Sequence, residues 1–176
     1  DQQSIDTVHA AIDAGVKFFD TAESYGDGHS DKVLGRALEG RRDDVILASK
    51  VSPGNLPADD LEVSLDASLE RLRTDYLDLY QVHWPNHDIP FEETASVLER
   101  MRIEGKIRYW GVSNFGKVDI QEAVAAAGHP VTNQVPYSLL WRVIEHDVVP
   151  LCVQDDVGIL CYSPLAQGIL TGKFDS

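Results

Sequence analysis

The stretch FFDTAESYG at residues 18–26 begins as an apolar run and ends in polar side chains. The same change recurs in three further stretches: ILASK at 46–50, YQVHW at 80–84 and YWGVSNF at 109–115. Each apolar run predicts a buried strand that ends near a side chain able to do chemistry, namely Asp20, Lys50, His83 or Asn114. In a barrel of parallel strands surrounded by helices, such strand ends converge on the face that carries the active site. Tyr25, just past the first strand, is expected on the same rim.

Predicted strands and helices alternate along the chain. Strands are expected at 17–22, 45–51, 77–83, 109–114, 131–137 and 158–164, because each is a short apolar run bounded by turn residues. Helices are expected at 4–14, 31–38, 58–73, 91–104 and 118–127, and 142–156 is expected to be helical in part, with Pro150 able to split it. This alternation predicts one parallel sheet with right-handed crossovers.

A closed barrel fits the sequence better than an open doubly wound sheet. The only glycine-rich stretch after the first strand is YGDGHSD at 25–31, which lacks the GxGxxG spacing of a dinucleotide-binding doubly wound fold. A (β/α)8 barrel needs eight strands and typically about 250 residues, whereas this chain has 176. We therefore expect residues 1–176 to be a single, incomplete barrel domain with about six β/α units, lacking the first and last strands.

The charge excludes two classes of partner. Asp and Glu outnumber Lys and Arg by 29 to 15, which gives a net charge of −14 and disfavours nucleic acid and anionic membranes. So acidic a surface is expected either in a protein adapted to high salt or simply in an acidic enzyme. No apolar stretch approaches the roughly 20 residues that span a bilayer, and no signal peptide opens the chain. The two cysteines, Cys152 and Cys161, are expected to be reduced and buried, and a cytoplasmic location follows.

The polar strand ends predict an acid–base site. Lys50 at the barrel mouth would be a poorly hydrated ammonium that needs a partner, and Asp20 is the natural one. Tyr25 could act as a general acid near neutral pH if a neighbouring cation such as Lys50 stabilises its phenolate. His83 alone is as readily structural as catalytic. His83 and His87 have the spacing of two metal ligands, but no further ligand lies nearby in the sequence, so no metal site is expected.

The later strands supply neutral hydrogen-bonding groups and an aromatic ring. Ser113 and Asn114, Gln134, and Tyr162 with Ser163 follow or end successive strands, and amide side chains with a stacking ring suit the carboxamide of a nicotinamide. The segment YSPLAQGILTGK at 162–173 contains Gly168 and Gly172, which permit close backbone approach to a phosphate. Its position after the last strand matches the place where barrels commonly bind phosphate.

Taken together, these segments resemble the aldo-keto reductase family. The resemblance rests on six stretches in the family's order: FFDTAESYGDGHSDKVLGRAL, ILASKV, DLYQVHW, EGKIRYWGVSNF, NQVPYSLL and YSPLAQGILTGK. They are most similar to the microbial branch related to potassium-channel β-subunits. The family is a (β/α)8 barrel that binds a nicotinamide cofactor, usually NADPH, and reduces small aldehydes and ketones by hydride transfer. The resemblance therefore implies an oxidoreductase with NADPH as cofactor, although NADH is not excluded because the 2′-phosphate site is absent from these residues.

The resemblance also implies a role for each site residue. Tyr25 would be the general acid, Lys50 held by Asp20 would assist it, and His83 would orient the carbonyl. Ser113, Asn114 and Gln134 would hold the carboxamide, Tyr162 would stack on the ring, and Trp84 would wall the substrate pocket. The pyrophosphate path would be lined by Ser163, Leu165, Gln167 and Lys173. Two alternatives remain: a non-catalytic regulatory subunit that binds cofactor as a sensor, and an aldolase using Lys50 as a Schiff base, which leaves Asn114, Gln134 and Tyr162 unexplained. The natural substrate and the oligomeric state do not follow from the sequence.

Overall fold

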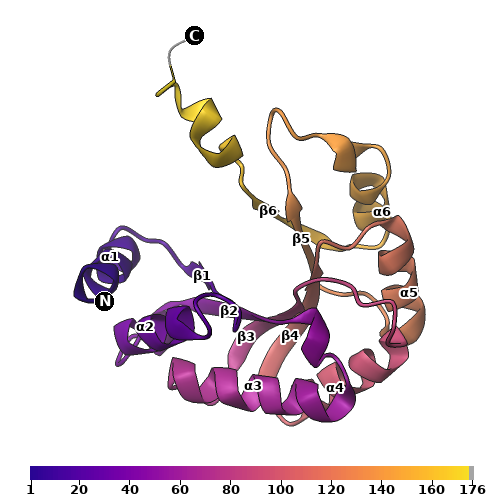
Figure 1. Cartoon of the computed structure of the whole chain (residues 1–176), viewed down its shortest axis with the longest axis horizontal. Helices are drawn as coiled ribbons and strands as arrows, with labels where there is room; N and C mark the ends of the chain where they lie inside the picture. The colour runs from indigo at the N-terminus through magenta and orange to yellow at the C-terminus, as the bar shows by residue number, and fades with distance from the viewer. Residues whose placement is uncertain (175–176) are drawn as a thin grey trace.

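A single sheet of six parallel strands forms the centre of the computed structural model, which describes residues 1–174 (Figure 1). The strands are β1 (Phe18–Asp20), β2 (Ile46–Val51), β3 (Leu77–Val82), β4 (Ile107–Ser113), β5 (Thr132–Pro136) and β6 (Gly158–Tyr162). They pair in chain order, each parallel to the next. The predicted alternation of strands and helices is confirmed, and β1 and β6 are the two edges of the described sheet.

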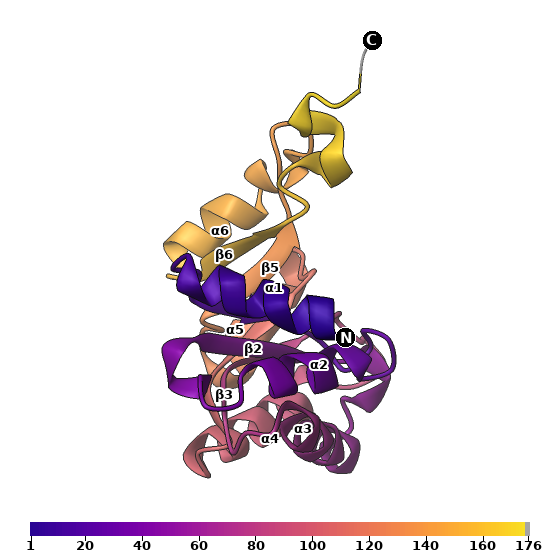
Figure 2. The ribbon, with the colours of Figure 1, turned by 90° about the vertical axis from the view of Figure 1, so that its left-hand side faces the viewer.

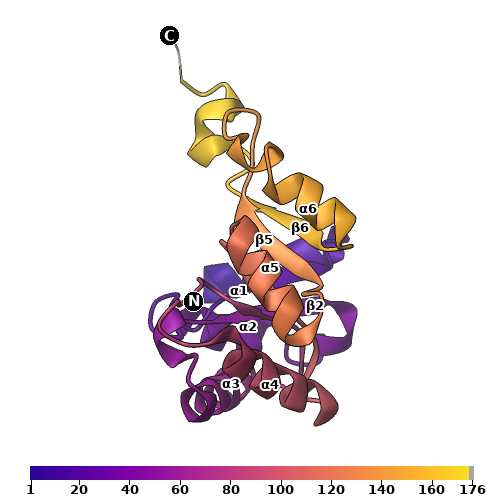
Figure 3. The same ribbon diagram turned by 90° about the vertical axis from the view of Figure 1, so that its right-hand side faces the viewer.

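Helices cover the convex, outer side of the curved sheet (Figure 1 and Figure 3). They are α1 (Gln2–Asp13), α2 (His29–Ala37), α3 (Ala58–Leu72), α4 (Phe91–Ile103), α5 (Lys117–Ala127) and α6 (Val148–Gln154). Figure 2 shows α1 near the β1 edge, where it contacts α2. Six β/α units of a barrel are therefore present in the described residues, as predicted.

The two faces of the sheet differ in burial because side chains alternate along each strand. On β2, Leu47 and Val51 are fully buried in the apolar core under the helices, together with the predicted stripe of α3. That stripe is Leu61, Leu65, Leu69 and Leu72. Ile46, also on β2, is exposed and lines a cavity with Phe18 and Tyr109 at the amino-terminal ends of the strands. The helix side is thus a closed core, whereas the concave side is open at this end.

Two expectations about the last third of the chain were wrong. The helical region at 142–156 is divided between the short 3-10 helix η3 (Val143–Glu145) and α6, rather than at Pro150. Pro150 lies in the first turn of α6, where a missing N–H removes no helical hydrogen bond, and the side chain of Asp147 caps that helix. Cys152 is buried as expected, but Cys161 is exposed because it lies on the edge strand β6.

Candidate active site

Lys50 is the most deeply buried charged group at the carboxyl ends of the strands. It lies near the end of β2 and is 1% exposed. Its Nζ donates to Oδ2 of Asp20 at 2.5 Å, to the backbone oxygen of Thr21 at 2.9 Å and to the hydroxyl of Tyr25 at 3.4 Å. The three N–H groups of an ammonium thus have three acceptors, which satisfies a cation that would otherwise be costly to bury.

Tyr25 links the buried ammonium to the open side of the site. It lies in the loop between β1 and α2 and is 42% exposed. Its ring meets the ring of His83 edge to face, with the centroids 5.8 Å apart, and Nζ of Lys50 lies 5.1 Å from the tyrosine centroid. Because the phenolic oxygen accepts from Lys50, its own O–H remains available to donate to another group.

His83 follows β3 and is held by the sheet. Its backbone N–H donates to the oxygen of Val51, which extends the β2–β3 pairing by one residue. Partial burial, and secondarily the positive charge of Lys50, lower the pKa of His83 below its usual value of 6.5. The imidazole is therefore neutral at pH 7 and can donate one hydrogen bond without carrying a charge.

The lowered pKa of His83 predicts an acid-sensitive stability. An unfolded chain would bind a proton at His83 near pH 6.5, whereas the folded chain binds it only at lower pH. His83 therefore does not lower the free energy of unfolding above about pH 6.5. Below that pH the free energy of unfolding decreases as the pH falls toward the pKa of His83 in the folded chain. We expect His83→Gln to lose less unfolding free energy than the wild type between pH 7 and pH 5, measured by urea denaturation. His129→Gln, at an exposed histidine, is the control; equal losses in His83→Gln and wild type would contradict the prediction.

A hydrogen-bonded group centred on Asn114 forms the opposite wall. Asn114 follows β4 with a φ of 63°, a left-handed conformation that few non-glycine residues adopt. Its Nδ2 donates to the backbone oxygen of His83 at 3.0 Å and to Oγ of Ser113 at 3.1 Å, and its Oδ1 accepts from the hydroxyl of Tyr162 at 2.8 Å. Burial, with a smaller effect of Tyr25, raises the pKa of Tyr162, which keeps this hydroxyl a donor. The amide of Asn114 therefore joins the ends of β3, β4 and β6, with both N–H groups used and one lone pair of Oδ1 left over.

A cavity of about 290 Å³ lies among these side chains. It is lined by Asp20, Tyr25, His83, Trp84, Ser113, Asn114, Gln134 and Tyr162. Trp84 is half exposed and forms part of the wall. The structure thus gathers three of the four acid–base candidates and four of the eight cofactor candidates around one space, and Lys50 contacts two of these lining residues from its buried position.

The other four cofactor candidates do not line this cavity. These are Ser163, Leu165, Gln167 and Lys173. They lie around the 3-10 helix η4 (Ala166–Thr171), which projects away from the sheet (Figure 1). Ile169 within this helix and Leu165 and Phe174 beside it are exposed. The phosphate path through these four residues stays a prediction.

Sequence reasoning missed two residues that connect this site to the scaffold. Thr21 is fully buried and supplies one of the three acceptors of Lys50. Glu23 accepts from the backbone N–H of Ser52 at 2.6 Å and from Nδ2 of Asn55 at 3.0 Å, which ties the loop after β1 to the loop after β2. Both lie inside the DTAE stretch at 20–23. Their polar side chains close to the end of a strand were the feature of the sequence that could have indicated them.

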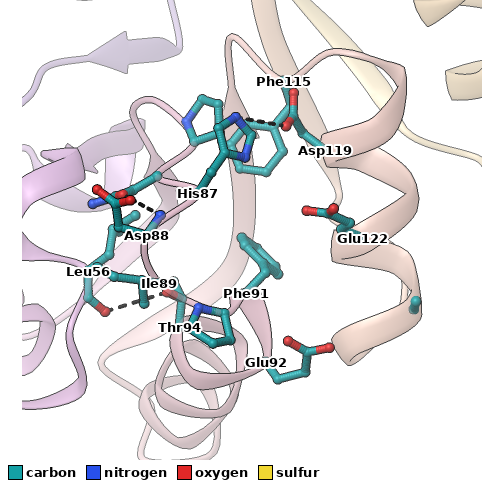
Figure 4. A pocket seen from close by; sticks show the side chains of 14 residues that line it. Leu56, His87, Asp88, Ile89, Phe91, Glu92, Thr94, Phe115, Asp119 and Glu122 are labelled. Atoms are coloured by element: carbon teal, nitrogen blue, oxygen red, sulfur yellow. Dashed lines mark hydrogen bonds and ion pairs between the residues drawn. The ribbon is translucent and has the colours of Figure 1, made fainter.

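A larger cavity, of about 460 Å³, lies between the loop after β3 and helix α5 (Figure 4). There the ligand atoms of His87, Asp119 and Glu122 are within 4.8 Å of one another, although no partner for His87 was expected from the sequence. His87 and Glu122 are exposed, and Asp119 Oδ2 accepts from the N–H of Gly116 at the start of α5. Asp119 thus caps α5 and lies 3.6 Å from Nε2 of His87, and we assign no metal to this group.

Comparisons with known proteins agree in one family. A family model described as "Aldo/keto reductase family" matches residues 1–176. Methylglyoxal reductase YeaE of Escherichia coli is 46% identical over 162 residues, which are 91% of this chain and 57% of that protein. A probable voltage-gated potassium channel subunit beta of Arabidopsis thaliana is 34% identical, over 93% of this chain and 55% of its own. The crystal structure of an aldo/keto reductase from Klebsiella pneumoniae in complex with NADP and acetate is 44% identical, with a TM-score of 0.90, over 97% of this chain and 61% of that one.

The chain thus spans little more than half the length of these relatives. Among the described residues, no helix is both long and apolar enough to cross a membrane.

Proposed function

Because this chain belongs to the aldo/keto reductase family, we propose that the complete protein reduces small aldehydes or ketones to alcohols with a nicotinamide cofactor. The observation that carries the proposal is the buried ammonium of Lys50, held by Asp20 and Thr21 and donating to the hydroxyl of Tyr25. A phenol so placed can give up its proton because the neighbouring cation stabilises the phenolate that remains.

Each of the four side chains has a role in moving one proton. Tyr25 donates its O–H to the carbonyl oxygen of the substrate, and Lys50 stabilises the resulting negative charge on the tyrosine. Asp20 balances the charge of the ammonium and fixes its position. His83, neutral at pH 7 and in edge contact with Tyr25, orients the carbonyl by donating a second hydrogen bond. Trp84 covers one side of the cavity and excludes water from the reacting oxygen.

The residues of β4, β5 and β6 fit a nicotinamide group. When bound, the cofactor supplies the hydride; NADPH is the proposed form, and NADH is not excluded. The ring of Tyr162 is anchored through its hydroxyl to Asn114, which leaves a fixed aromatic face for stacking. The side chain of Gln134 lines the same cavity, so it can bond the carboxamide with Ser113, while Asn114 can accept from it through the second lone pair of Oδ1. The pyrophosphate path of Ser163, Leu165, Gln167 and Lys173 is proposed from the family resemblance.

Two competing functions differ from this one at Lys50. An aldolase needs a neutral amine with a free lone pair, whereas Nζ of Lys50 makes three donor contacts, which disfavours nucleophilic attack. A regulatory subunit that senses cofactor is the runner-up, and the similarity to a probable potassium channel subunit favours it. Such a subunit has no need of the contact between Tyr25 and Lys50, so a reductase explains the site better.

A reductase assay tests the proposal. We expect the complete protein to oxidise NADPH in the presence of methylglyoxal, the substrate named for the Escherichia coli relative, or of another small aldehyde. Loss of NADPH absorbance and detection of the alcohol by mass spectrometry are the measurements. NADPH binding without turnover of any aldehyde or ketone in a broad panel would contradict the reductase and support the sensor.

We propose that residues 1–176 are one domain, that the protein works in the cytoplasm on small carbonyl compounds, and that it binds neither nucleic acid nor membrane. The net charge of −14 supports the exclusion of anionic partners. The same net charge is the sole basis for proposing adaptation to high salt. The reductase assay is therefore run at low and at molar concentrations of KCl.

A further inference from the structure

A partly buried ion pair lies directly behind the candidate active site, with the side chain of Arg71 20% exposed. Asp31, on α2, is completely buried, and its Oδ2 accepts from Nε and Nη2 of Arg71 at 3.1 and 3.0 Å. The other oxygen, Oδ1, accepts from Oγ1 of Thr21 at 2.9 Å. Arg71, near the end of α3, also donates to Oγ of Ser68. Both carboxylate oxygens are thus used, one by a cation and one by a residue next to Asp20.

Thr21 connects this pair to Lys50. Its side chain bonds Asp31, its N–H donates to the oxygen of Ala48 on β2, and its own backbone oxygen accepts from Nζ of Lys50 at 2.9 Å. Thr21 also directly follows Asp20, the other principal acceptor of the ammonium. Fixing Thr21 from its side chain therefore fixes the backbone that supplies two of the three acceptors of Lys50.

The chain around Asp31 is shaped to admit Arg71. Gly28 has a φ of +77°, and a Cβ there would lie 2.6 Å from Cδ of Arg71. A Cβ at Gly35 would lie 2.6 Å from the backbone oxygen of Arg71 and 2.8 Å from Cα of Leu72. Both distances are too short for any side chain, so these glycines let α2 lie against the end of α3. The GHSDKVLG stretch at 28–35 thus seats the arginine against the carboxylate.

Stability alone is a weak reason for such a pair. Burying the carboxylate of Asp31 is expensive even with a partner, and well-packed apolar side chains of similar size are often equally stabilising. We infer that Asp31 and Arg71 are positioning residues: they hold the carbonyl of Thr21, and through it the ammonium of Lys50, at the place from which it acts on Tyr25. This inference rests on the proposed reductase function.

The chain contains a matched control for a purely structural role. Asp78, on β3, is also a mostly buried carboxylate; it accepts from Arg42 at 2.8 Å and from Leu47 N at 2.9 Å, and it pairs with Arg108 at 2.9 Å. It lies near the amino-terminal end of its strand, at the end of the sheet opposite to the candidate site. Asp78→Asn therefore removes the ion pairs of a buried carboxylate with two arginines without touching the support of Lys50.

The experiment compares Asp31→Asn with Asp78→Asn in the complete protein. We expect both variants to lower the midpoint of urea unfolding. Under conditions where both remain folded, Asp31→Asn should reduce kcat by roughly 10-fold or more with little change in the KM for NADPH, while Asp78→Asn keeps kcat within about twofold of the wild type. If Asp31→Asn does not fold, Thr21→Val removes the hydroxyl that bonds Asp31, together with its contact to Oγ of Ser30 at 3.0 Å, and should lower kcat in the same way. Thr21→Ser, which keeps the hydroxyl, should keep kcat close to the wild-type value.

A second measurement separates positioning from general damage. In a Lys50→Met background, Asp31→Asn should lower stability as before but should not lower the residual turnover further, because the group it positions is gone. Multiplicative losses of turnover, or equal kcat values for Asp31→Asn and Asp78→Asn in an otherwise active enzyme, would overturn the inference. An inactive wild type would instead contradict the proposed reductase function, and the inference would fall with it.

Discussion

Replacement of Tyr25 by Phe is expected to reduce kcat by about 10²- to 10⁴-fold, the range for loss of a general acid. The phenolic oxygen is the only part of this side chain that Lys50 contacts by a hydrogen bond, whereas the edge contact with His83 belongs to the ring and is kept by Phe. The KM for NADPH should therefore stay close to the wild-type value. Steady-state kinetics with an aldehyde substrate, together with NADPH titration by fluorescence, measure both quantities.

The matched control for this substitution is Tyr109→Phe. Tyr109 lies on β4 and lines the cavity at the amino-terminal ends of the strands, away from Lys50. It should retain full turnover, because its hydroxyl contacts none of the candidate residues. A Tyr25→Phe enzyme with near-normal kcat would remove the tyrosine from the mechanism, and parallel losses in both variants would point to a general effect of altering the concave face.

The strands and helices were predictable because their apolar patterns are local. The stripe of α3 recurs at helical spacing, and each strand is a short apolar run closed by a glycine, a proline or a polar residue. The convergence of Asp20, Lys50 and His83 followed from one topological rule, that parallel strands end on the same face. The effect of Pro150 depends on its position in the helix. A proline breaks the interior of a helix, but Pro150 lies in the first turn of α6, where it is tolerated.

The support of the site was not predictable in the same way. Asp31 and Arg71 are 40 residues apart, and each by itself reads as an ordinary charged residue on an amphipathic helix. Their pairing depends on how closely α2 packs on α3, which only the Gly28 and Gly35 positions indicate. The segment at 162–173 was expected near the site because of its order in the chain. Tyr162, its first residue, lines the cavity, whereas Leu165 and Ile169 are exposed, and the sequence of a loop does not specify what it packs against.

Lys50→Met is expected to lower kcat by roughly 10²- to 10³-fold, the range for removing one charge-stabilising group from a preorganised site. Methionine has a similar length and can fill the buried space, so the change mainly deletes the ammonium. It also leaves Asp20 without its cation. Breaking a fully buried pair typically costs about 3–5 kcal/mol, but the side chain of Asp20 is 24% exposed and keeps access to water, so we expect a loss below about 3 kcal/mol.

The double variant Asp20→Asn/Lys50→Met separates these two consequences. Removing the unpaired carboxylate should recover a large part of the lost stability, measured by urea unfolding, because the remaining groups are neutral. Turnover should not recover, because neither of the two introduced side chains carries a positive charge that could stabilise the phenolate of Tyr25. If instead kcat rose together with stability in the double variant, Lys50 would be acting only by keeping the strand ends folded. If the ammonium of Lys50 acts in proton transfer, the double variant should recover stability to unfolding but not kcat.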